Sequence, residues 1–493
     1  MLLLGIDLGT SSIKVSVVDA STQECLASAK YPDTESPIDV PAPGWAEQDP
    51  AMWWDHVCAA IQRVHAQKAY DPGAIGAIGI AYQMHGLVIL DKAGAVLRPS
   101  IIWCDSRAVE TGNAALEAIG RGRALNHLLN SPGNFTASKL GWVKNNEPAV
   151  YARVDKAMLP GDYIAYRMTG EATTSISALS EGIFWDFKED RLSEDVFRYF
   201  GFDTRLIPEV RPVFAEHGRL SKDVARLLGL TPGVPVTYKA GDQPNNALSL
   251  NVLKPGEVAA TAGTSGVIYG VTDQLLVDVA SRVNTFAHVN YLPDVKRLGV
   301  LLCINGTGIL NRWVREQVGA GLSYEAINRE AASVPVGSEG VRILPFGNGA
   351  ERMLGNRIPG AQIQGLDLNK HTRAHLFRAS QEGIAFAFRY GLDILRENGM
   401  SPSRIRAGMA NLFLSEVFTD AFVEITGVPV DLYRNDGSVG AALGAGIGAG
   451  AFATEAEAFS HTVPVKQVKP TGARAYEQAY KEWLALLEPQ VVV

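Results

Sequence analysis

The fold is decided by the stretch Gly5-Ile6-Asp7-Leu8-Gly9-Thr10-Ser11-Ser12, near the start of the 493-residue chain. The apolar residues 2–6 predict a buried strand, and the alternation of apolar residues over 13–17 predicts a second strand running back. Glycine, threonine and serine in the turn between them expose N–H groups and hydroxyls to an anion. The sequence therefore predicts a β-hairpin with a phosphate-binding turn.

Asp7 places a carboxylate directly before this turn. A carboxylate beside a phosphate cradle is favourable when a divalent cation joins the two, and Mg²⁺ prefers oxygen ligands. An ordinary hairpin with a surface Asp is the alternative, because one Asp-x-Gly-Thr match is a weak signal. Lys14, on the second strand, is open between a phosphate ligand and an exposed strand residue.

A second hairpin of the same kind is predicted about half the chain downstream. Residues 258–269 place apolar residues on both sides of Gly263-Thr264-Ser265-Gly266. Two such hairpins predict two related domains, each presenting a phosphate loop to a shared cleft. We assign residues 1–248 to the N-terminal domain and residues 249–493 to the C-terminal domain.

The composition agrees with two large domains. The chain is too long for a single core, and 47% of its residues are hydrophobic while 20% are charged. A net charge of −7 without a basic run argues against nucleic acid as the main partner. The four cysteines lie far apart, with no pair at metal-ligand spacing, as expected for reduced thiols in the cytoplasm.

Residues 437–453 are rich in glycine and alanine, with the small-xxx-small spacing of packed membrane helices. The segment is short and weakly hydrophobic, and acidic residues flank it at Asp436 and Glu455. We therefore expect no membrane span, but a helix packed closely against a sheet or a nucleotide. The chain opens on a strand, with no basic flank or cleavage site, so no signal peptide is expected.

The other hydrophobic patterns alternate between strands and helices. We expect strands at residues 74–81, 87–90 and 234–239, and helices at residues 51–66 and 376–398. Asp49 and Pro50 are typical of the start of the first helix, and Gly399 of the end of the second. Two of the strands lead into polar loops, residues 83–86 and 241–243.

Together these motifs resemble the carbohydrate kinases of the glycerol kinase and xylulokinase (FGGY) family, and most of all its xylulokinase branch. The resemblance covers nearly the whole chain, in the family's order, and rests on residues 5–12, 44–50, 83–86, 103–107, 135–139, 159–163 and 241–242. It implies an α/β fold of two actin-like (ribonuclease H-like) ATPase domains around a central catalytic cleft.

The resemblance also implies how the phosphoryl group is transferred. Asp242 would be the general base that accepts the proton of the sugar hydroxyl, with a helix-capping Asp as the alternative. Asp7 would hold Mg²⁺ through water, with Asp242 as the second carboxylate near the metal. The implied nucleotide contacts are Gly9, Thr10, Ser11, Ser12, Lys14, Gly263, Thr264, Ser265, Gly306, Gly408, Ala410 and Asn411.

The residues implied in sugar binding are Gln83, Met84, His85, Trp103, Asp105, Asp242 and Gln243. His85 can exchange hydrogen bonds with hydroxyls, and Met84 can line an adaptable apolar wall. Glycerol kinases tend to carry a charged pair at this place, so the loop favours a pentulose over glycerol. Trp103 either packs beneath the substrate or is a buried core residue, and Asp105 would support the site.

Three segments depart from the family pattern. Residues 408–415 lack the Gly-Gly-Gly-Ala run with which many relatives bind adenosine, so Leu412 and Phe413 predict a reshaped adenine pocket. Residues 350–353 read Ala-Glu-Arg-Met where relatives often show Gly-Glu-Arg-Thr-Pro. Gln243 stands where xylulokinases usually have Asn.

We therefore expect ATP-dependent phosphorylation of a pentulose, with D-xylulose as the first candidate, and with ATP and Mg²⁺ as cofactors. Ribulose, fuculose, gluconate and glycerol are the alternative substrates within the family. A non-kinase ATPase of the actin and chaperone kind is the alternative function. We expect a small sugar as the partner, with no nucleic acid and no membrane, and a homodimer is left open.

Overall fold

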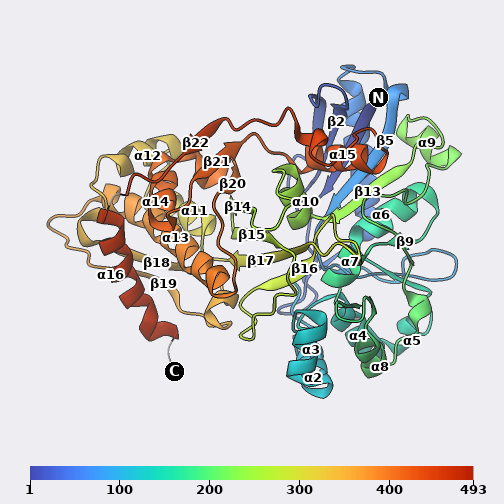
Figure 1. Ribbon diagram of the computed structural model, residues 1–493, viewed down its shortest axis with the longest axis horizontal. Coiled ribbons are helices and arrows are strands. Elements are labelled where there is room, and N and C mark those ends of the chain that lie inside the picture. Colours follow the sequence, from blue (N-terminus) through green and yellow to red (C-terminus); the bar gives the residue numbers. More distant parts are fainter. Residues whose placement is uncertain (473, 492–493) are drawn as a thin grey trace.

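The computed structural model describes residues 1–472 and 474–491. Two mixed sheets lie in separate lobes, the first on the right of Figure 1 in blue and green, and the second on the left in yellow and orange. Each lobe thus has its own sheet with helices around it, as expected for a pair of actin-like domains.

The first sheet has five strands in the order β13-β5-β1-β2-β3. Their bounds are β1 Leu2–Leu8, β2 Ile13–Asp19, β3 Cys25–Tyr31, β5 Ile75–Tyr82 and β13 Val236–Gly241. β1, β2 and β3 are antiparallel in turn, whereas β5 runs parallel to β1, and β13 runs parallel to β5. The carboxyl ends of β1, β5 and β13 therefore meet at one edge, where Asp7, the loop 83–86 and Asp242 begin.

The second sheet has seven strands in the order β16-β17-β15-β14-β20-β21-β22. Their bounds are β14 Val258–Ala262, β15 Gly266–Thr272, β16 Asn284–Ala287, β17 Leu298–Ile304, β20 Ile405–Gly408, β21 Val430–Tyr433 and β22 Lys466–Val468. From β17 to β21 the pairing repeats that of the first sheet: an antiparallel meander followed by two parallel strands. This repeat confirms the second hairpin and its equivalence to the first.

Side chains of β1 alternate between the two faces of the first sheet, as the two-residue period of a strand requires. Leu2, Leu4 and Ile6 pack in the core under α1 (Pro50–Ala66) and α6 (Pro160–Thr169). Leu3 belongs to the core on the opposite face, under α15 (Gly437–Gly448). Asp7 shares the face of Leu3, and so it points toward the start of α15.

Helix α15 packs unusually close to this sheet because glycines line the contact. A Cβ on Gly5 would collide with the carbonyl oxygen of Ser438, and one on Gly79 would collide with the carbonyl oxygen of Ala441. On the helix side, Gly444 lies against the ring of Tyr238. The prediction of a closely packed helix within residues 437–453 is therefore confirmed for Gly437–Gly448, which packs on the sheet.

In the second lobe, the long helix α13 is the centre of the helical layer. The helices of this lobe are α11 Gly308–Gln317, α12 Tyr324–Ala332, α13 Arg373–Glu397, α14 Glu416–Thr426 and α16 Arg474–Val491, beside the hairpin of β18 (Arg342–Phe346) and β19 (Gly360–Gln364). Figure 1 shows α16 along the outer side of this lobe.

A third core joins the lobes. It contains residues of α2 (Val109–Ile119), α3 (Arg121–Leu128), α4 (Thr136–Asn146), α7 (Ile176–Glu181) and α8 (Glu194–Phe200), together with Phe286 and Ala287 of β16. The side chain of Asn130 pairs with the edge of β16, since it donates to the carbonyl of Thr285 at 2.6 Å and accepts from the N–H of Thr285 at 2.9 Å. Residues of the first lobe thus pack and hydrogen-bond against β16, the edge strand of the second sheet.

The expected elements are present, with ends that differ by up to three residues. The strands lie at Ile75–Tyr82, at β6 (Val88–Leu90) and at Val236–Gly241, and the helices lie at Pro50–Ala66 and Arg373–Glu397. Asp49 is the N-cap of α1, where its side chain accepts from the N–H of Ala51 at 2.9 Å.

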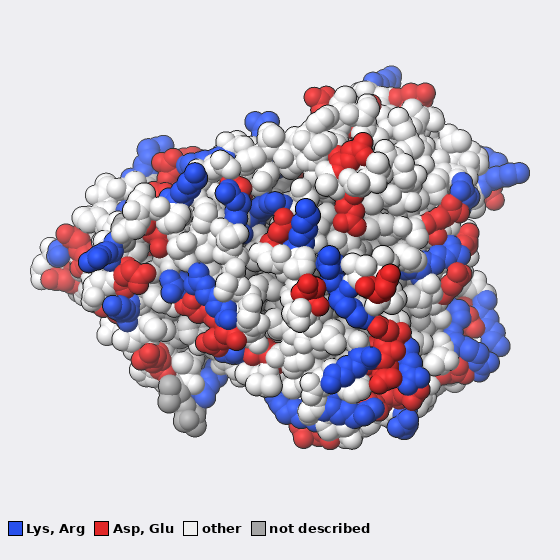
Figure 2. Space-filling model, viewed as in Figure 1, with Lys and Arg blue, Asp and Glu red and all other residues white. Residues whose placement is uncertain are grey.

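Of the helices within residues 1–472 and 474–491, not one is both long and apolar enough to span a membrane. Figure 2 shows basic and acidic side chains interspersed over this face of the molecule.

The contact between α15 and the sheet yields a stability prediction. Gly79→Ala places a methyl group against a helix carbonyl oxygen, which α15 can avoid only by moving, so we expect the free energy of unfolding to fall by about 1–3 kcal/mol. Gly76→Ala, in the same strand, is the matched control, because its methyl would meet only the flexible side chain of Met1. Urea denaturation of both variants checks this, and equal losses would contradict it.

Candidate active site

Three other segments of the chain hydrogen-bond to the first loop, residues 9–12. The hydroxyl of Thr10 donates to Oε1 of Gln83 at 3.1 Å and accepts from the indole N–H of Trp103 at 2.9 Å. Gln48 donates to the carbonyl of Thr10 at 2.9 Å and accepts from the side-chain amide of Gln83 at 3.1 Å. The network joins the expected phosphate loop to Gln83 and Trp103 of the expected sugar site.

Three carboxylates converge at the edge of the first sheet. Asp7 is the last residue but one of β1, Asp242 is the first residue of α10 (Asp242–Ser249), and Asp436 is the N-cap of α15. A Cβ on Gly437 would collide with the Asp7 carboxylate, so Asp7 lies directly under the start of α15. Lys14 forms an ion pair with Asp436 and is therefore part of this cluster.

Asp242 is not at the N-cap position of its helix. The N-cap of α10 is Gly241, and the Asp242 carboxyl interacts instead with the backbone and side chain of Gln243. The contact with the N–H of Gln243 lies in the first turn of α10, so the helix-capping alternative and the role of Asp242 as a base both stay predictions.

The crowding of like charges changes the acidity of this cluster. Burial and the Asp436 carboxylate raise the pKa of Asp7 to about 6, although the Lys14 ammonium opposes them. Burial and the Asp7 carboxylate raise the pKa of Asp242 to about 7. Partly shielded carboxylates that repel each other are a suitable donor set for a hard divalent cation, which would favour both charged forms. The residues present therefore fit Mg²⁺.

The second loop, residues 263–265, is fixed by the start of α11. The carbonyl of Gly263 accepts from the N–H of Gly308 at 2.9 Å, and the carbonyl of Thr264 accepts from the N–H of Ile309 at 3.1 Å. Gly306 is buried, and its N–H donates to Oε1 of Glu351 at 2.9 Å. The structure thus brings Gly306 to the second loop, with its own N–H already paired.

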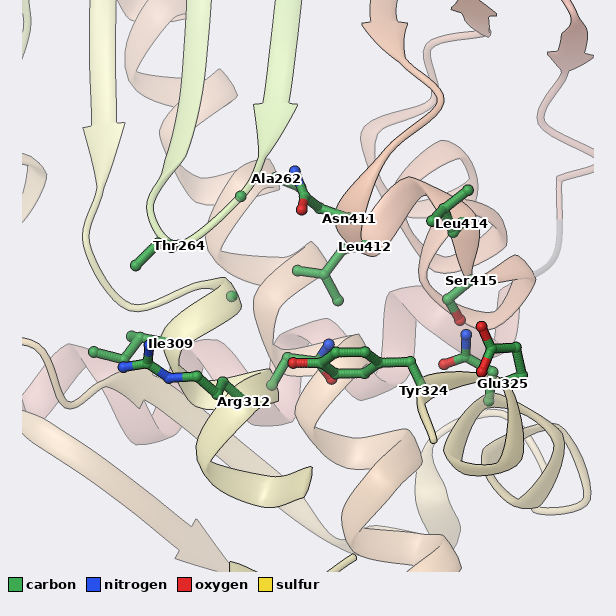
Figure 3. Close-up of a pocket in the computed structure, with 14 residues that line it drawn as sticks. Ala262, Thr264, Ile309, Arg312, Tyr324, Glu325, Asn411, Leu412, Leu414 and Ser415 are labelled. Atoms are coloured by element: carbon green, nitrogen blue, oxygen red, sulfur yellow. The ribbon is translucent and has the colours of Figure 1, made fainter. Parts of the chain in front are cut away.

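A cavity of about 320 Å³ opens beside the second loop (Figure 3). Figure 3 shows Thr264 on the hairpin side, with Arg312 and Tyr324 on the wall below it in this view. The residues that line the cavity include Gly263, Thr264, Ile309, Asn311, Arg312, Tyr324, Glu325, Asn328, Asn411, Leu412, Leu414 and Ser415. The volume and the mixed lining are typical of a small-molecule site.

Leu412 and Phe413 have different positions in this region. Leu412 lines the cavity, whereas Phe413 packs into the core against Phe418 and Phe422. Asn411 lines the cavity with its backbone in the left-handed region, while Gly408 and Ala410 are outside the lining. Of the two side chains expected to reshape an adenine pocket, Leu412 therefore lines the cavity and Phe413 does not.

An oriented amide lies on the same wall. The hydroxyl of Ser415 donates to Oε1 of Gln381 at 2.6 Å, and Nε2 of Gln381 donates to Oδ1 of Asn328 at 3.0 Å. This chain leaves the Asn328 NH₂ group as a donor for a ligand in the cavity.

His85 is held in one orientation in the loop after β5. Its Nδ1–H donates to the carbonyl of Glu181 at 3.1 Å, and its ring packs edge-on against Phe135 at a centroid distance of 4.8 Å. Burial and the nearby Lys139 ammonium lower the pKa of His85 to about 3, so the ring is neutral. Its Nε2 is therefore left as a hydrogen-bond acceptor.

Trp103 and Asp105 differ sharply in exposure. Trp103 is 53% exposed, so the alternative of a buried core Trp is wrong. Asp105 is fully buried, where it accepts from the N–H of Ala46 at 2.6 Å and from the guanidinium of Arg107 at 2.7 Å. Asp105 therefore fixes the backbone at Ala46 and the side chain of Arg107, as expected for a residue that supports the site.

The motifs did not indicate Asp436 as a site residue. The available signal was the order Asp-Gly-Ser at the start of a helix, which is typical of an N-cap. The cavity walls from α11 and α12, including Arg312, Tyr324 and Asn328, carry no motif at all.

Glu339, His371 and His375 also bring ligand-type atoms within 4.8 Å of one another. Each imidazole accepts a backbone N–H at Nδ1, from Asp367 to His371 at 2.9 Å and from Thr372 to His375 at 3.1 Å. A neutral imidazole that accepts at Nδ1 carries its proton on Nε2, which then has no lone pair for a metal. We assign no metal site to this group.

Comparisons with known proteins agree with this geometry. The N-terminal domain of the FGGY family of carbohydrate kinases matches residues 2–249, and the C-terminal domain of that family matches residues 258–451. The chain is 29% identical to the xylulose kinase of Haemophilus influenzae, over 98% of this chain and 99% of that protein. It is 30% identical to the xylulose kinase of Escherichia coli, over 90% of this chain and 88% of that protein.

The crystal structure of xylulose kinase from Rhodospirillum rubrum is similar with a TM-score of 0.87 and 26% sequence identity, over 99% of both chains. The chain therefore belongs to the FGGY family of carbohydrate kinases, with two actin-like domains, and is an ATP-dependent sugar kinase.

Proposed function

We propose that this kinase transfers the γ-phosphoryl group of ATP to the terminal hydroxyl of D-xylulose, giving D-xylulose 5-phosphate. The observation that carries the proposal is the position of Asp242, whose helix begins beside Met84 and at the same sheet edge as Asp7. The named xylulose kinases among the relatives, matched over most of their length, support D-xylulose as the sugar.

Asp242 acts as the general base. As the sugar oxygen attacks the γ-phosphorus, the new O–P bond forms, the bond from that phosphorus to the β–γ bridging oxygen breaks, and the hydroxyl proton passes to the Asp242 carboxylate. A pKa of about 7 is matched to this task, because the carboxyl is partly ionised at neutral pH and its anion readily accepts a proton.

The two loops supply the phosphate contacts. The first loop (9–12) and the second (263–265) would donate main-chain N–H groups and hydroxyls, since transfer is mainly a problem of position and charge. Mg²⁺, when held near Asp7 and Asp242, would neutralise phosphate charge. The cavity beside Thr264 and Asn411 would bind the adenine ring of ATP, with the ring of Tyr324 as a stacking surface.

The loop 83–86 would bind the sugar. Nε2 of His85 would accept a hydrogen bond from a hydroxyl, and Met84 would supply an apolar wall. The loop carries no charged side chain, which suits a neutral ketose better than gluconate.

A sugar panel tests the substrate. ADP release would be measured with D-xylulose, ribulose, fuculose, gluconate and glycerol, and we expect the highest kcat/KM for D-xylulose. A higher kcat/KM for another sugar would refute the substrate, and sugar-independent ATP turnover alone would refute the proposal as a whole.

Asp242→Asn should lower kcat by about 10²–10⁴-fold, because the amide keeps the shape of the carboxyl but cannot accept the proton. Nucleotide affinity, measured by calorimetry with ADP, should change much less. Near-normal turnover in this variant would remove Asp242 from the role of base.

The same substitution should have a pH-dependent effect on stability. In the folded metal-free protein the pKa of Asp242 is raised, so the stability linked to this carboxyl is complete below its unfolded pKa near 4 and is lost as the pH rises through about 7. The Asp242→Asn variant has no carboxyl group to ionise at this position, so it does not lose this stability as the pH rises. The melting temperature of the variant should therefore exceed that of the wild type at pH 8, and the excess should shrink toward pH 5. Parallel melting curves from pH 5 to 8 would contradict the raised pKa.

His85→Ala should raise the KM for the sugar by about three- to tenfold, the effect of one lost hydrogen bond, while the KM for ATP stays near its wild-type value. His65→Ala is a matched control, because that imidazole bonds only Tyr70 and the carbonyl of Leu228. Equal changes in both KM values for His85→Ala would place His85 outside the sugar site.

A further inference from the structure

Glu181, the last residue of α7, is a buried acid that the proposed mechanism does not use. Only 2% of the residue is exposed, and among the described residues its Oε1 has no hydrogen-bond partner. A Cβ placed on Gly241 would lie 2.9 Å from Oε2 of Glu181 and 2.6 Å from Cγ of Met84. The carboxyl group and the Met84 side chain therefore both lie against Gly241, the residue that precedes Asp242.

Glu181 also controls His85. Its backbone carbonyl accepts the Nδ1–H of the His85 ring, which is the contact that leaves Nε2 free as an acceptor. The backbone carbonyl of Glu181 thus contacts one of the side chains expected to face the sugar, and its carboxyl group lies near the other at Gly241.

The surroundings of the carboxyl group favour its neutral form. Burial is the main cause that raises the pKa of Glu181 well above its ordinary value, and the carboxyls of Asp242 and Asp162 act in the same direction. The Tyr82 hydroxyl and the Lys139 ammonium oppose this, but the ammonium of Lys139 donates to the carbonyls of His85 and Ile102 instead.

Packing alone does not account for a carboxyl at this place. An apolar side chain of similar size would fill the space beside Gly241 and would remove the unpaired carboxyl oxygen, at the cost of the hydrogen bond to the buried Tyr82 hydroxyl. A stability cost that is retained beside an active site is typical of a residue selected for function.

We propose that Glu181 is a positioning residue that determines the sugar specificity of this kinase, because it fixes the Met84 side chain and the His85 ring against the start of α10. This inference rests on the proposed sugar site, but on no particular sugar. It assigns to α7 the control of which polyol or ketose fits against the loop 83–86.

The test compares Glu181→Leu with Glu181→Gln, using whichever sugar the wild type phosphorylates fastest. For Glu181→Leu we expect a small change in melting temperature, because the loss of the unpaired oxygen offsets the lost bond to the Tyr82 hydroxyl. We expect the KM for the sugar to rise about three- to tenfold and the KM for ATP to stay nearly unchanged. The ratio of kcat/KM between the best sugar and the next should fall. Glu181→Gln keeps the shape and polarity of the neutral acid, and should recover most of the sugar affinity and of this ratio.

Ser180→Ala is the matched control on the same helix. Its hydroxyl accepts from the N–H of Ala287 in β16 at 2.9 Å, so the variant should lose stability without a change in the KM for the sugar.

The proposal is overturned if Glu181→Leu lowers the melting temperature and leaves the sugar KM and the sugar ratio unchanged, since Glu181 would then be a structural residue. It is also overturned if Glu181→Gln is as impaired as Glu181→Leu. Should Glu181→Leu not fold, Glu181→Met carries the same comparison, and failure of both to fold counts against the proposal. Failure of the proposed function is a separate result, because the wild type would then phosphorylate no sugar.

Discussion

The close packing of α15 on the first sheet is the constraint on which the rest of the active site depends. Glycines at the contact let the helix backbone approach the strands Leu2–Leu8 and Ile75–Tyr82 at a distance that side chains would prevent. This approach brings the N-cap Asp436 and Gly437 against Asp7. Packing elsewhere thus holds the carboxyl groups of Asp7, Asp242 and Asp436 close together. Burial is the main cause that raises the pKa of Asp7 and of Asp242, and a neighbouring carboxylate acts in the same direction on each.

The repeated strand order explains why the site has two loops of one kind. In each sheet the antiparallel hairpin presents its turn at the edge where the parallel strands also end, so a Gly-Thr-Ser turn reaches the cleft from either side. The two lobes differ in the segments that follow their parallel strands. In the first lobe these are the loop 83–86 and Asp242, and in the second they are the cavity-lining residues around Asn411.

The sequence allowed the two domains and the pairing of their loops to be predicted, because these depend on short-range patterns. Alternating apolar residues define the hairpins, Asp49-Pro50 defines the start of α1, and the Gly/Ala spacing of residues 437–448 defines a closely packed helix. The family motifs indicated His85 and Asp242, and their surroundings in the structure are compatible with the roles expected of them.

Contacts between distant segments could not be predicted in this way. Asp436 meets Asp7 only because α15 crosses to the first sheet, 429 residues along the chain, and no local pattern encodes that crossing. The sequence around Trp103 did not decide whether its side chain is buried or exposed, and the structure shows it exposed and bonded to Thr10. The Ser415, Gln381 and Asn328 chain likewise joins three helical segments, each of which is unremarkable alone.

Helix α7 has a mechanical consequence that arises from its two sets of contacts. At its end the carbonyl of Glu181 holds the His85 ring, while Ser177 and Ser180 bond both backbone groups of Ala287 in β16, each at 2.9 Å. A buried helix of six residues has little room to bend, and close-packed interiors transmit displacement rather than absorb it. The His85 ring and the edge strand of the sheet that carries the second phosphate loop are therefore anchored to one short buried helix, so their relative position is fixed by the packing of α7.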